Sequence, residues 1–216
     1  LKEKEMFEIE YKGANCVIIS TKKTRLVTDP KLSIVGLNDI QTKDSVELAT
    51  EERFATNNPE STLVIDSPGE YGVGDLHISG FTAQRHIDSE KESKQATIYR
   101  IEIGDARIGL LGNIFGKLSE DQLEQLGVVD VLILPVGGNG YTLDAKSAAD
   151  LIHTIDPKVV IPVHYSDPKI KYEVPQDNLQ SFVSELGIPV ETMAKYKVKQ
   201  TPFAPDSLMV VELTRN

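Results

Sequence analysis

Short hydrophobic runs recur along the chain, many of them rich in valine and isoleucine, and most end in polar or glycine-containing segments. Runs of this length with such endings are typical of β-strands. They predict strands at residues 7–11, 16–20, 25–28, 62–66, 73–81, 97–103, 107–111, 129–134, 158–163, 190–193 and 208–213. We therefore expect a chain built mainly from β-sheet.

Helices are expected at three places in the second half of the chain, where apolar residues follow the helical spacing between start and stop signals. Ser119 and Gln122 form a capping box that begins the first helix, and Gly127 ends it. The bounds of the other two are Thr142 or Asp144 to Ile155, and Pro175 to Gly187. Strands followed by strands that alternate with helices predict an α+β fold, an αββα sandwich of two mixed sheets flanked by helices.

Candidate functional residues follow directly after three of the hydrophobic runs. They are Asn113, the pair Gly137 and Gly138, and the pair His164 and Tyr165. The first polar residue after a buried strand is held rigidly at the rim of a sheet, where binding sites form. The imidazole of His164 suits a metal ligand or a proton carrier. The two glycines either form a simple turn or bind a phosphate or carboxylate through backbone amides.

Length and composition indicate one folded unit. With 216 residues, 40% of them hydrophobic, the chain can bury a substantial core without a stabilising disulfide bond or metal ion. We expect a single domain at residues 6–216, preceded by a charged extension or tag remnant at residues 1–5. The single cysteine, Cys16, lies in an apolar strand and is expected to be buried.

The charge and hydropathy of the chain limit its partners. A formal charge of −10 opposes binding to nucleic acid, which relies on lysine and arginine. The most lysine-rich segment, residues 195–199, alternates like a strand with one solvated face. No apolar stretch is long enough for a membrane span and no signal peptide is recognisable. We therefore expect no nucleic acid and no membrane as partners, and a cytoplasmic location.

A set of short motifs follows one another in a fixed order along the chain. They are the strand end that contains Asp29, residues 68–71, the His86 region, and residues 111–113, 134–138, 141–145 and 161–165. In this order the chain from about Met6 onward resembles the metallo-β-lactamase superfamily, and within it the ascorbate-6-phosphate lactonase-like branch of predicted zinc-dependent hydrolases. The resemblance implies a metallo-β-lactamase-like sandwich with one or two zinc ions at the strand ends.

The zinc ligands that the resemblance implies are mostly replaced. The family signature T-H-x-H-x-D-H falls on residues 50–56, where the ligand positions are occupied by Glu51, Arg53, Ala55 and Thr56. The bridging aspartate expected after Gly112 is Asn113. His86 and His164 remain, whereas catalytic zinc usually has three protein ligands and a water.

Two interpretations of the altered motif stay open. Either the guanidinium of Arg53 replaces the metal and pairs with Asp29, Glu51 or Glu52, or the residues around Arg53 lie on a solvated loop. A reduced metal site is a further hypothesis, in which Glu51 joins the two histidines in a facial triad.

The function predicted from these departures is non-catalytic, because the ligands that would activate a metal-bound water are lost. We expect a pseudoenzyme that needs no cofactor and binds a small anionic ligand or a protein partner, with self-association as a further expectation. The alternative is a divergent metal-dependent hydrolase of a phosphoester or lactone that holds one zinc or other divalent ion. No catalytic residue is assigned. The predicted pocket residues are Asp29, Glu51, Glu52, Arg53, Asn113, Gly137, Gly138 and Tyr165, and the candidate metal ligands are His86 and His164.

Overall fold

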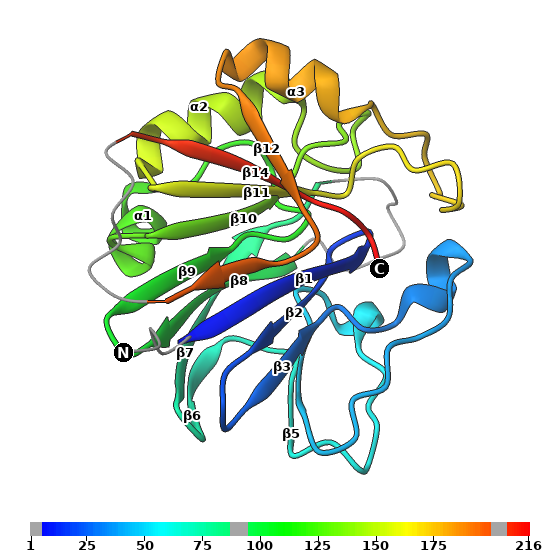
Figure 1. Cartoon of the computed structure of the whole chain (residues 1–216), viewed down its shortest axis with the longest axis vertical. Helices are drawn as coiled ribbons and strands as arrows, with labels where there is room; N and C mark the ends of the chain where they lie inside the picture. Colours follow the sequence, from blue (N-terminus) through cyan, green and yellow to red (C-terminus); the bar gives the residue numbers. More distant parts are fainter. Residues whose placement is uncertain (1–5, 87–94, 200–206) are drawn as a thin grey trace.

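Two mixed sheets stacked face to face form the centre of the computed structural model, which describes residues 6–86, 95–199 and 207–216 (Figure 1). The first sheet has the strand order β13 (Tyr196–Val198), β1 (Phe7–Gly13), β2 (Cys16–Ser20), β3 (Arg25–Thr28), β4 (Val46–Leu48), β5 (Leu63–Ile65). The second has the order β12 (Val190–Met193), β14 (Met209–Leu213), β11 (Val159–Val163), β10 (Val131–Pro135), β9 (Ala106–Leu110), β8 (Gln95–Ile103), β7 (Leu76–Gln84), β6 (Gly69–Val73).

Both sheets combine parallel and antiparallel pairs, as the predicted α+β fold requires. In the first sheet β1, β2 and β3 are antiparallel neighbours, and β3, β4 and β5 are parallel. In the second sheet the pairs from β12 to β9 are parallel and those from β9 to β6 are antiparallel. Alternate residues of β1 are buried, so that one face of this strand packs into the core between the sheets.

The α-helices lie on the outer face of the second sheet (Figure 1). They are α1 (Glu120–Leu126), α2 (Ala145–Ile155) and α3 (Leu179–Leu186), with N-caps at Ser119, Asp144 and Asn178. The predicted capping box of α1 and its end at Gly127 are confirmed. The outer face of the first sheet is covered by a short 3₁₀ helix, Leu32–Val35, and by Ile170. None of the helices among the described residues is long and apolar enough to cross a bilayer.

The structure differs from the sequence prediction where short elements are concerned. The strand expected at residues 73–81 corresponds to β7, at Leu76–Gln84, and the strand before it, β6, was not expected. The two form a hairpin that turns at Gly74 with a φ of 62°. Residues 46–48 add a strand, and Glu52–Phe54 form a 3₁₀ helix that the apolar pattern does not indicate. The lysine-rich segment is confirmed as strand β13. Cys16 is buried, as expected.

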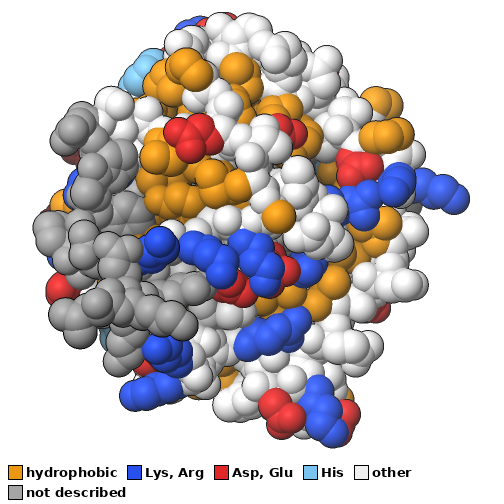
Figure 2. Space-filling view, viewed as in Figure 1, with side chains coloured by type: hydrophobic (Ala, Val, Ile, Leu, Met, Phe, Trp, Pro, Cys, Tyr) orange, Lys and Arg blue, Asp and Glu red, His pale blue; other side chains and the backbone are white. Residues whose placement is uncertain are grey.

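Basic side chains form a row across the face shown in Figure 2, over β1 and β13. Lys195 pairs with Glu8 and Glu10 at 2.9 and 2.8 Å, and Lys197 pairs with Glu8 at 3.4 Å. These lysines are therefore matched by carboxylates of the neighbouring strand, and this row is a cross-strand ladder of ion pairs.

The carboxyl ends of the parallel strands in both sheets meet at one edge of the sandwich. Directly beyond β4, the backbone oxygen of Thr50 accepts a 2.8 Å hydrogen bond from the amide of Thr97 in the second sheet. The hydroxyl of Tyr99 donates to the oxygen of Ala49 at 3.0 Å. These bonds fix the end of β4 against the second sheet. The residues that follow β4 lie at this junction of the two sheets, which we call the seam.

Gly112, at the end of β9, packs against Thr50 in the same seam. Its φ is 62°, and a β-carbon at this position would lie 2.7 Å from Thr50 Cβ. We predict that Gly112→Ala lowers the free energy of unfolding by about 1–3 kcal/mol, measured by urea denaturation. Gly187→Ala is the control, because its φ is 70° but no atom lies within 4 Å of the added carbon. Equal losses in the two variants would contradict the steric part of the argument.

Candidate functional site

A cavity of about 370 Å³ opens at the seam, between the end of β4 and the end of β7. Its wall combines charged side chains with hydroxyl groups. The described lining residues are Thr50, Glu51, Glu52, Arg53, Asp66, Ser67, Pro68, Thr82, Arg85, Gln95, Ala96 and Thr97. This cavity is the candidate site, because it lies where strand ends of both sheets converge.

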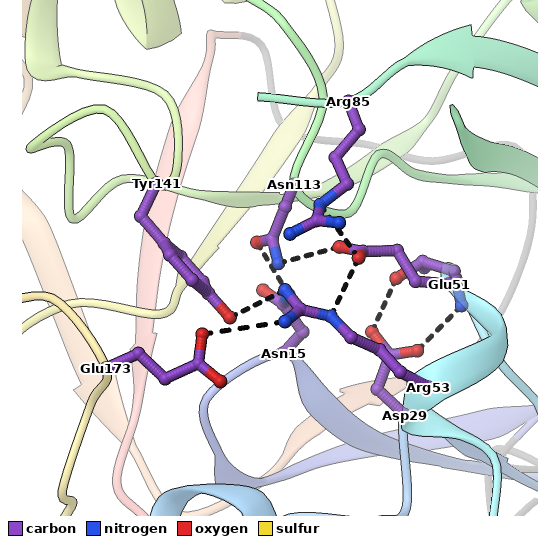
Figure 3. A network of polar contacts seen from close by, with 9 residues as sticks. Asn15, Asp29, Glu51, Arg53, Arg85, Asn113, Tyr141 and Glu173 are labelled. Carbon is purple, nitrogen blue, oxygen red and sulfur yellow. Dashed lines mark hydrogen bonds and ion pairs between the residues drawn. The ribbon is translucent and has the colours of Figure 1, made fainter. Parts of the chain in front are cut away.

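Glu51 is the centre of a buried polar network beside this cavity (Figure 3). Its Oε2 accepts hydrogen bonds from Nε of Arg53 at 2.9 Å and from Nε of Arg85 at 3.0 Å. Its Oε1 accepts from Nδ2 of Asn113 at 3.1 Å. Burial raises the pKa of Glu51, whereas the charges of Arg53 and Arg85 oppose that shift. Two guanidiniums thus share one carboxylate at the cavity wall.

Arg53 extends from its 3₁₀ helix toward the second sheet. Its Nη2 donates to the hydroxyl of Tyr141 at 2.8 Å, and its Nη1 lies 3.5 Å from Oε2 of Glu173. The guanidinium carbon lies 4.7 Å from the centre of the Phe54 ring. The alternative of a solvated loop is therefore wrong for this segment, since the Arg53 side chain is only 20% exposed.

The two asparagines of the network form a chain of hydrogen bonds. Asn113, which donates to Glu51, accepts from Nδ2 of Asn15 at 2.8 Å through its Oδ1. Oδ1 of Asn15 is buried and has no hydrogen-bond partner among the described residues. Because Glu51 can only accept when ionised, it determines the orientation of both amides.

Asp29 lies behind the network and does not pair with Arg53. Both of its carboxylate oxygens accept from Thr50, one from the amide and one from the hydroxyl, each at 2.7 Å. Burial raises the pKa of Asp29 to about 7, although the bonds from Thr50 oppose the shift. Its φ is 43°, so this residue is held in a left-handed conformation. Of the three predicted partners of Arg53, the structure places Glu51 in contact.

His164 follows β11, as predicted, and is buried with a φ of 52°. Its Nδ1 lies 3.1 Å from Oε1 of Gln176, and its ring lies between Tyr141 and Tyr172, with centroid distances of 5.4 and 4.6 Å. The side-chain nitrogen of Gln176 donates to the oxygen of Val174, so Oε1 is its acceptor and Nδ1 of His164 carries the hydrogen. Burial lowers the pKa of His164 to about 4, which keeps the ring neutral at pH 7.

His164 and Asp29 both line a second cavity of about 10 Å³, which has room for about one water molecule. His86 lines neither cavity. Its ring lies 5.7 Å from that of Phe115, and its backbone amide donates to the backbone oxygen of Asn113. Within residues 6–86, 95–199 and 207–216, no three histidine, cysteine, aspartate or glutamate side chains are grouped so that they could hold a metal ion.

The donor set therefore does not fit a conventional metal site. Glu51, the third ligand of the predicted facial triad, is bonded to two arginines instead. Nε2 of His164 could still bind a metal, but Asn113 is already used by Glu51 and Asn15. The triad hypothesis is not supported by this geometry.

The other predicted pocket residues divide into two groups. Glu52 is exposed and lines the larger cavity. Gly137 and Gly138 are buried in the turn after β10, where a β-carbon on Gly137 would lie 2.3 Å from the oxygen of His164. Tyr165 packs on Tyr11 with a centroid distance of 6.1 Å. These last three line neither of the two cavities. Turn geometry accounts for the two glycines, and core packing accounts for Tyr165.

Arg85 is the main site residue that the sequence analysis missed. It is 3% exposed and lies at the end of β7, where Phe81, Ala83 and Arg85 are buried in alternation with exposed residues. This period of two was the available signal, because it predicts that Arg85 is buried like Phe81 and Ala83. Tyr141 and Glu173 gave no such signal.

Comparison with known proteins adds the family. The profile of the Beta-lactamase superfamily domain matches residues 8–164. A UPF0173 metal-dependent hydrolase of Natranaerobius thermophilus is 33% identical over 224 residues, which cover 85% of this chain and 99% of that protein. A UPF0173 protein of Pyrococcus abyssi is 30% identical over 101 residues, which cover 47% of this chain and 44% of that protein. The matched segments span about half the length of the first curated relatives, 44, 54 and 50%.

A solved structure shows the shared fold. A Thermotoga maritima protein named for a Zn-dependent hydrolase of the metallo-β-lactamase superfamily aligns with a TM-score of 0.74 and 23% identity, covering 96% of this chain and 100% of that one. This likeness confirms the predicted sandwich. The narrower resemblance to ascorbate-6-phosphate lactonases stays a prediction.

The comparisons also correct the predicted function. Several relatives are named metal-dependent hydrolases, so the prediction of a non-catalytic pseudoenzyme is wrong and the hydrolase alternative is better supported. The same names make a divalent metal plausible in the family, and the expectation that no cofactor is involved is not supported by them. The profile match, the UPF0173 relatives and the shared sandwich lead to one conclusion: the chain belongs to the metallo-β-lactamase superfamily.

Proposed function

We propose that this chain is a divergent hydrolase that cleaves an anionic ester, a phosphoester or a lactone with an acidic group, in the cavity beside Arg53 and Arg85. The observation that carries the proposal is the pair of guanidiniums on one carboxylate at the cavity wall. Relatives named hydrolases support the class of reaction. Guanidinium groups match the geometry of phosphate and carboxylate oxygens, which supports an anionic substrate.

The cavity wall can stabilise negative charge during hydrolysis. Arg53 and Arg85 supply positive charge, and the hydroxyls of Ser67, Thr82 and Thr97 add hydrogen-bond donors around the same space. Donors fixed before the reaction stabilise the oxyanion that forms when water adds to phosphorus or to a lactone carbonyl.

Glu51 is the proposed proton acceptor for the attacking water. From the described residues, its Oε1 accepts one hydrogen bond, from Asn113, whereas its Oε2 accepts two. Water forms the new O–P or O–C bond, its proton passes to Glu51, the ester bond breaks, and the leaving oxygen takes the proton back. Burial raises the pKa of Glu51, which makes it a better base than a solvated carboxylate.

Hydrolysis of a substrate panel tests the proposal. Tag-free protein is assayed with phosphomonoesters, phosphodiesters and lactones, each with a chelator and again with added zinc or manganese. We expect turnover of at least one class, and a kcat/KM at least about tenfold lower for Arg85→Met. Arg215→Met is the control, because Arg215 pairs with Asp167 at 2.7 Å and does not line the cavity. Absence of turnover in every condition would refute the proposal.

A further inference from the structure

Arg53 occupies the centre of the strand-end seam in a fixed position. Its guanidinium is held by Glu51, Tyr141 and Glu173, which come from three separate parts of the chain (Figure 3). Its carbon also lies 5.6 Å from the centre of the Tyr141 ring, as well as over Phe54. An arginine with three polar partners and two aromatic rings near its guanidinium has little freedom to leave the site.

The groups that could bind a cation at this place already have partners. Glu51 accepts from two guanidiniums and one amide, and both oxygens of Asp29 accept from Thr50. The nearby carboxylate of Glu173 also faces Arg53. A divalent ion entering here would have to break these bonds and approach a permanent positive charge.

We infer that the guanidinium of Arg53 serves as the built-in cation of this site and excludes a divalent metal from it. This inference rests on the proposed function, because it concerns the same cavity. It implies that the substrate anion is neutralised by arginine, and that hydrolysis proceeds equally well with a chelator. The pocket would thus differ from those of the relatives named metal-dependent hydrolases.

Removal of Arg53 should create cation affinity where the wild type has none. In Arg53→Met the apolar stem still packs on Phe54, but Glu51 and Glu173 lose a positive partner and face the vacated space. Glu51 keeps its bond from Arg85, but the two carboxylates then offer oxygen ligands without the charge of Arg53 between them. Arg53→Lys keeps the charge and should still exclude the ion.

Metal binding by calorimetry and elemental analysis tests the inference without reference to activity. Tag-free wild type, Arg53→Met, Arg53→Lys and Arg215→Met are titrated with zinc and with manganese. We expect at least about tenfold tighter binding by Arg53→Met than by the other three proteins. Arg215 is a matched control, since its side chain is 21% exposed and that of Arg53 20%.

Two outcomes would overturn the inference. One is about one equivalent of metal retained by the wild type and lost in His164→Ala, which would show a metal site despite Arg53. The other is no gain in Arg53→Met while circular dichroism shows that this variant is folded. A gain of binding in a protein that hydrolyses none of the substrates would support the inference and refute only the proposed function.

Discussion

Glu51→Gln should lower the free energy of unfolding by about 3–5 kcal/mol, since it removes the negative charge from a buried ionic cluster. Arg85 is 3% exposed and Arg53 is partly buried, and Glu51 is the carboxylate that both contact. Glutamine keeps the shape of the side chain but leaves two desolvated guanidiniums close together. Urea denaturation at pH 7, followed by circular dichroism, measures the loss.

Glu173→Gln is the matched control for this prediction. Glu173 also contacts Arg53, at 3.5 Å, but its side chain is 44% exposed. Exposed ion pairs contribute about 0–1 kcal/mol, so this variant should stay close to the wild type. Similar losses in the two variants would show that burial of Glu51 is not what makes its charge important.

Asp29 should make the protein less stable as the pH rises from about 4 to about 7. Its pKa is raised from 3.8 to about 7 by burial, so in this window the folded state holds a proton that the unfolded state releases. The stabilisation is complete below the unfolded pKa and is lost as the pH rises through the folded pKa. A shift of about three pKa units corresponds to roughly 4 kcal/mol.

The difference between wild type and Asp29→Asn isolates this effect. Asparagine stays uncharged, so urea denaturation at about pH 4.5, 6 and 7.5 should show the wild type losing stability relative to the variant. His164 titrates with the opposite sign, because its lowered pKa makes the unfolded state bind more protons between about pH 4 and 6.5, but it is present in both proteins. A constant difference across these pH values would contradict the raised pKa of Asp29.

The fold was predictable because its signals are local. Strand lengths, β-branched runs and the capping box at Ser119 all act within a few residues, and each gave the element that the structure shows. Strand β6 was missed, and the turn at Gly74 fell inside the strand expected at residues 73–81. The 3₁₀ helix at Glu52–Phe54 has too few residues to show a period.

The site was predictable only in part. Strand ends identified Asn113 and His164, and the resemblance to the family pointed to Glu51 and Arg53. The partners of Arg53 are distant in sequence, with Tyr141 88 residues away and Glu173 120 residues away. Such contacts follow from how the two sheets stack, which no local pattern specifies. The departures from the family signature led to the wrong predicted function, because altered ligands do not by themselves mean lost activity.

The hydrogen bonds from Asn15 through Asn113 to Glu51 all run in one direction, with the donor on the side away from the carboxylate. Each amide donates toward the carboxylate, so a single ionised group orders two side chains, the second of them just beyond β1 on the other sheet. If Glu51 is protonated or replaced by glutamine, its side chain can donate as well as accept. Neither orientation of the two amides is then preferred by their hydrogen bonds to residue 51. The negative charge of Glu51 thus fixes the orientation of two buried amide side chains, those of Asn113 and Asn15.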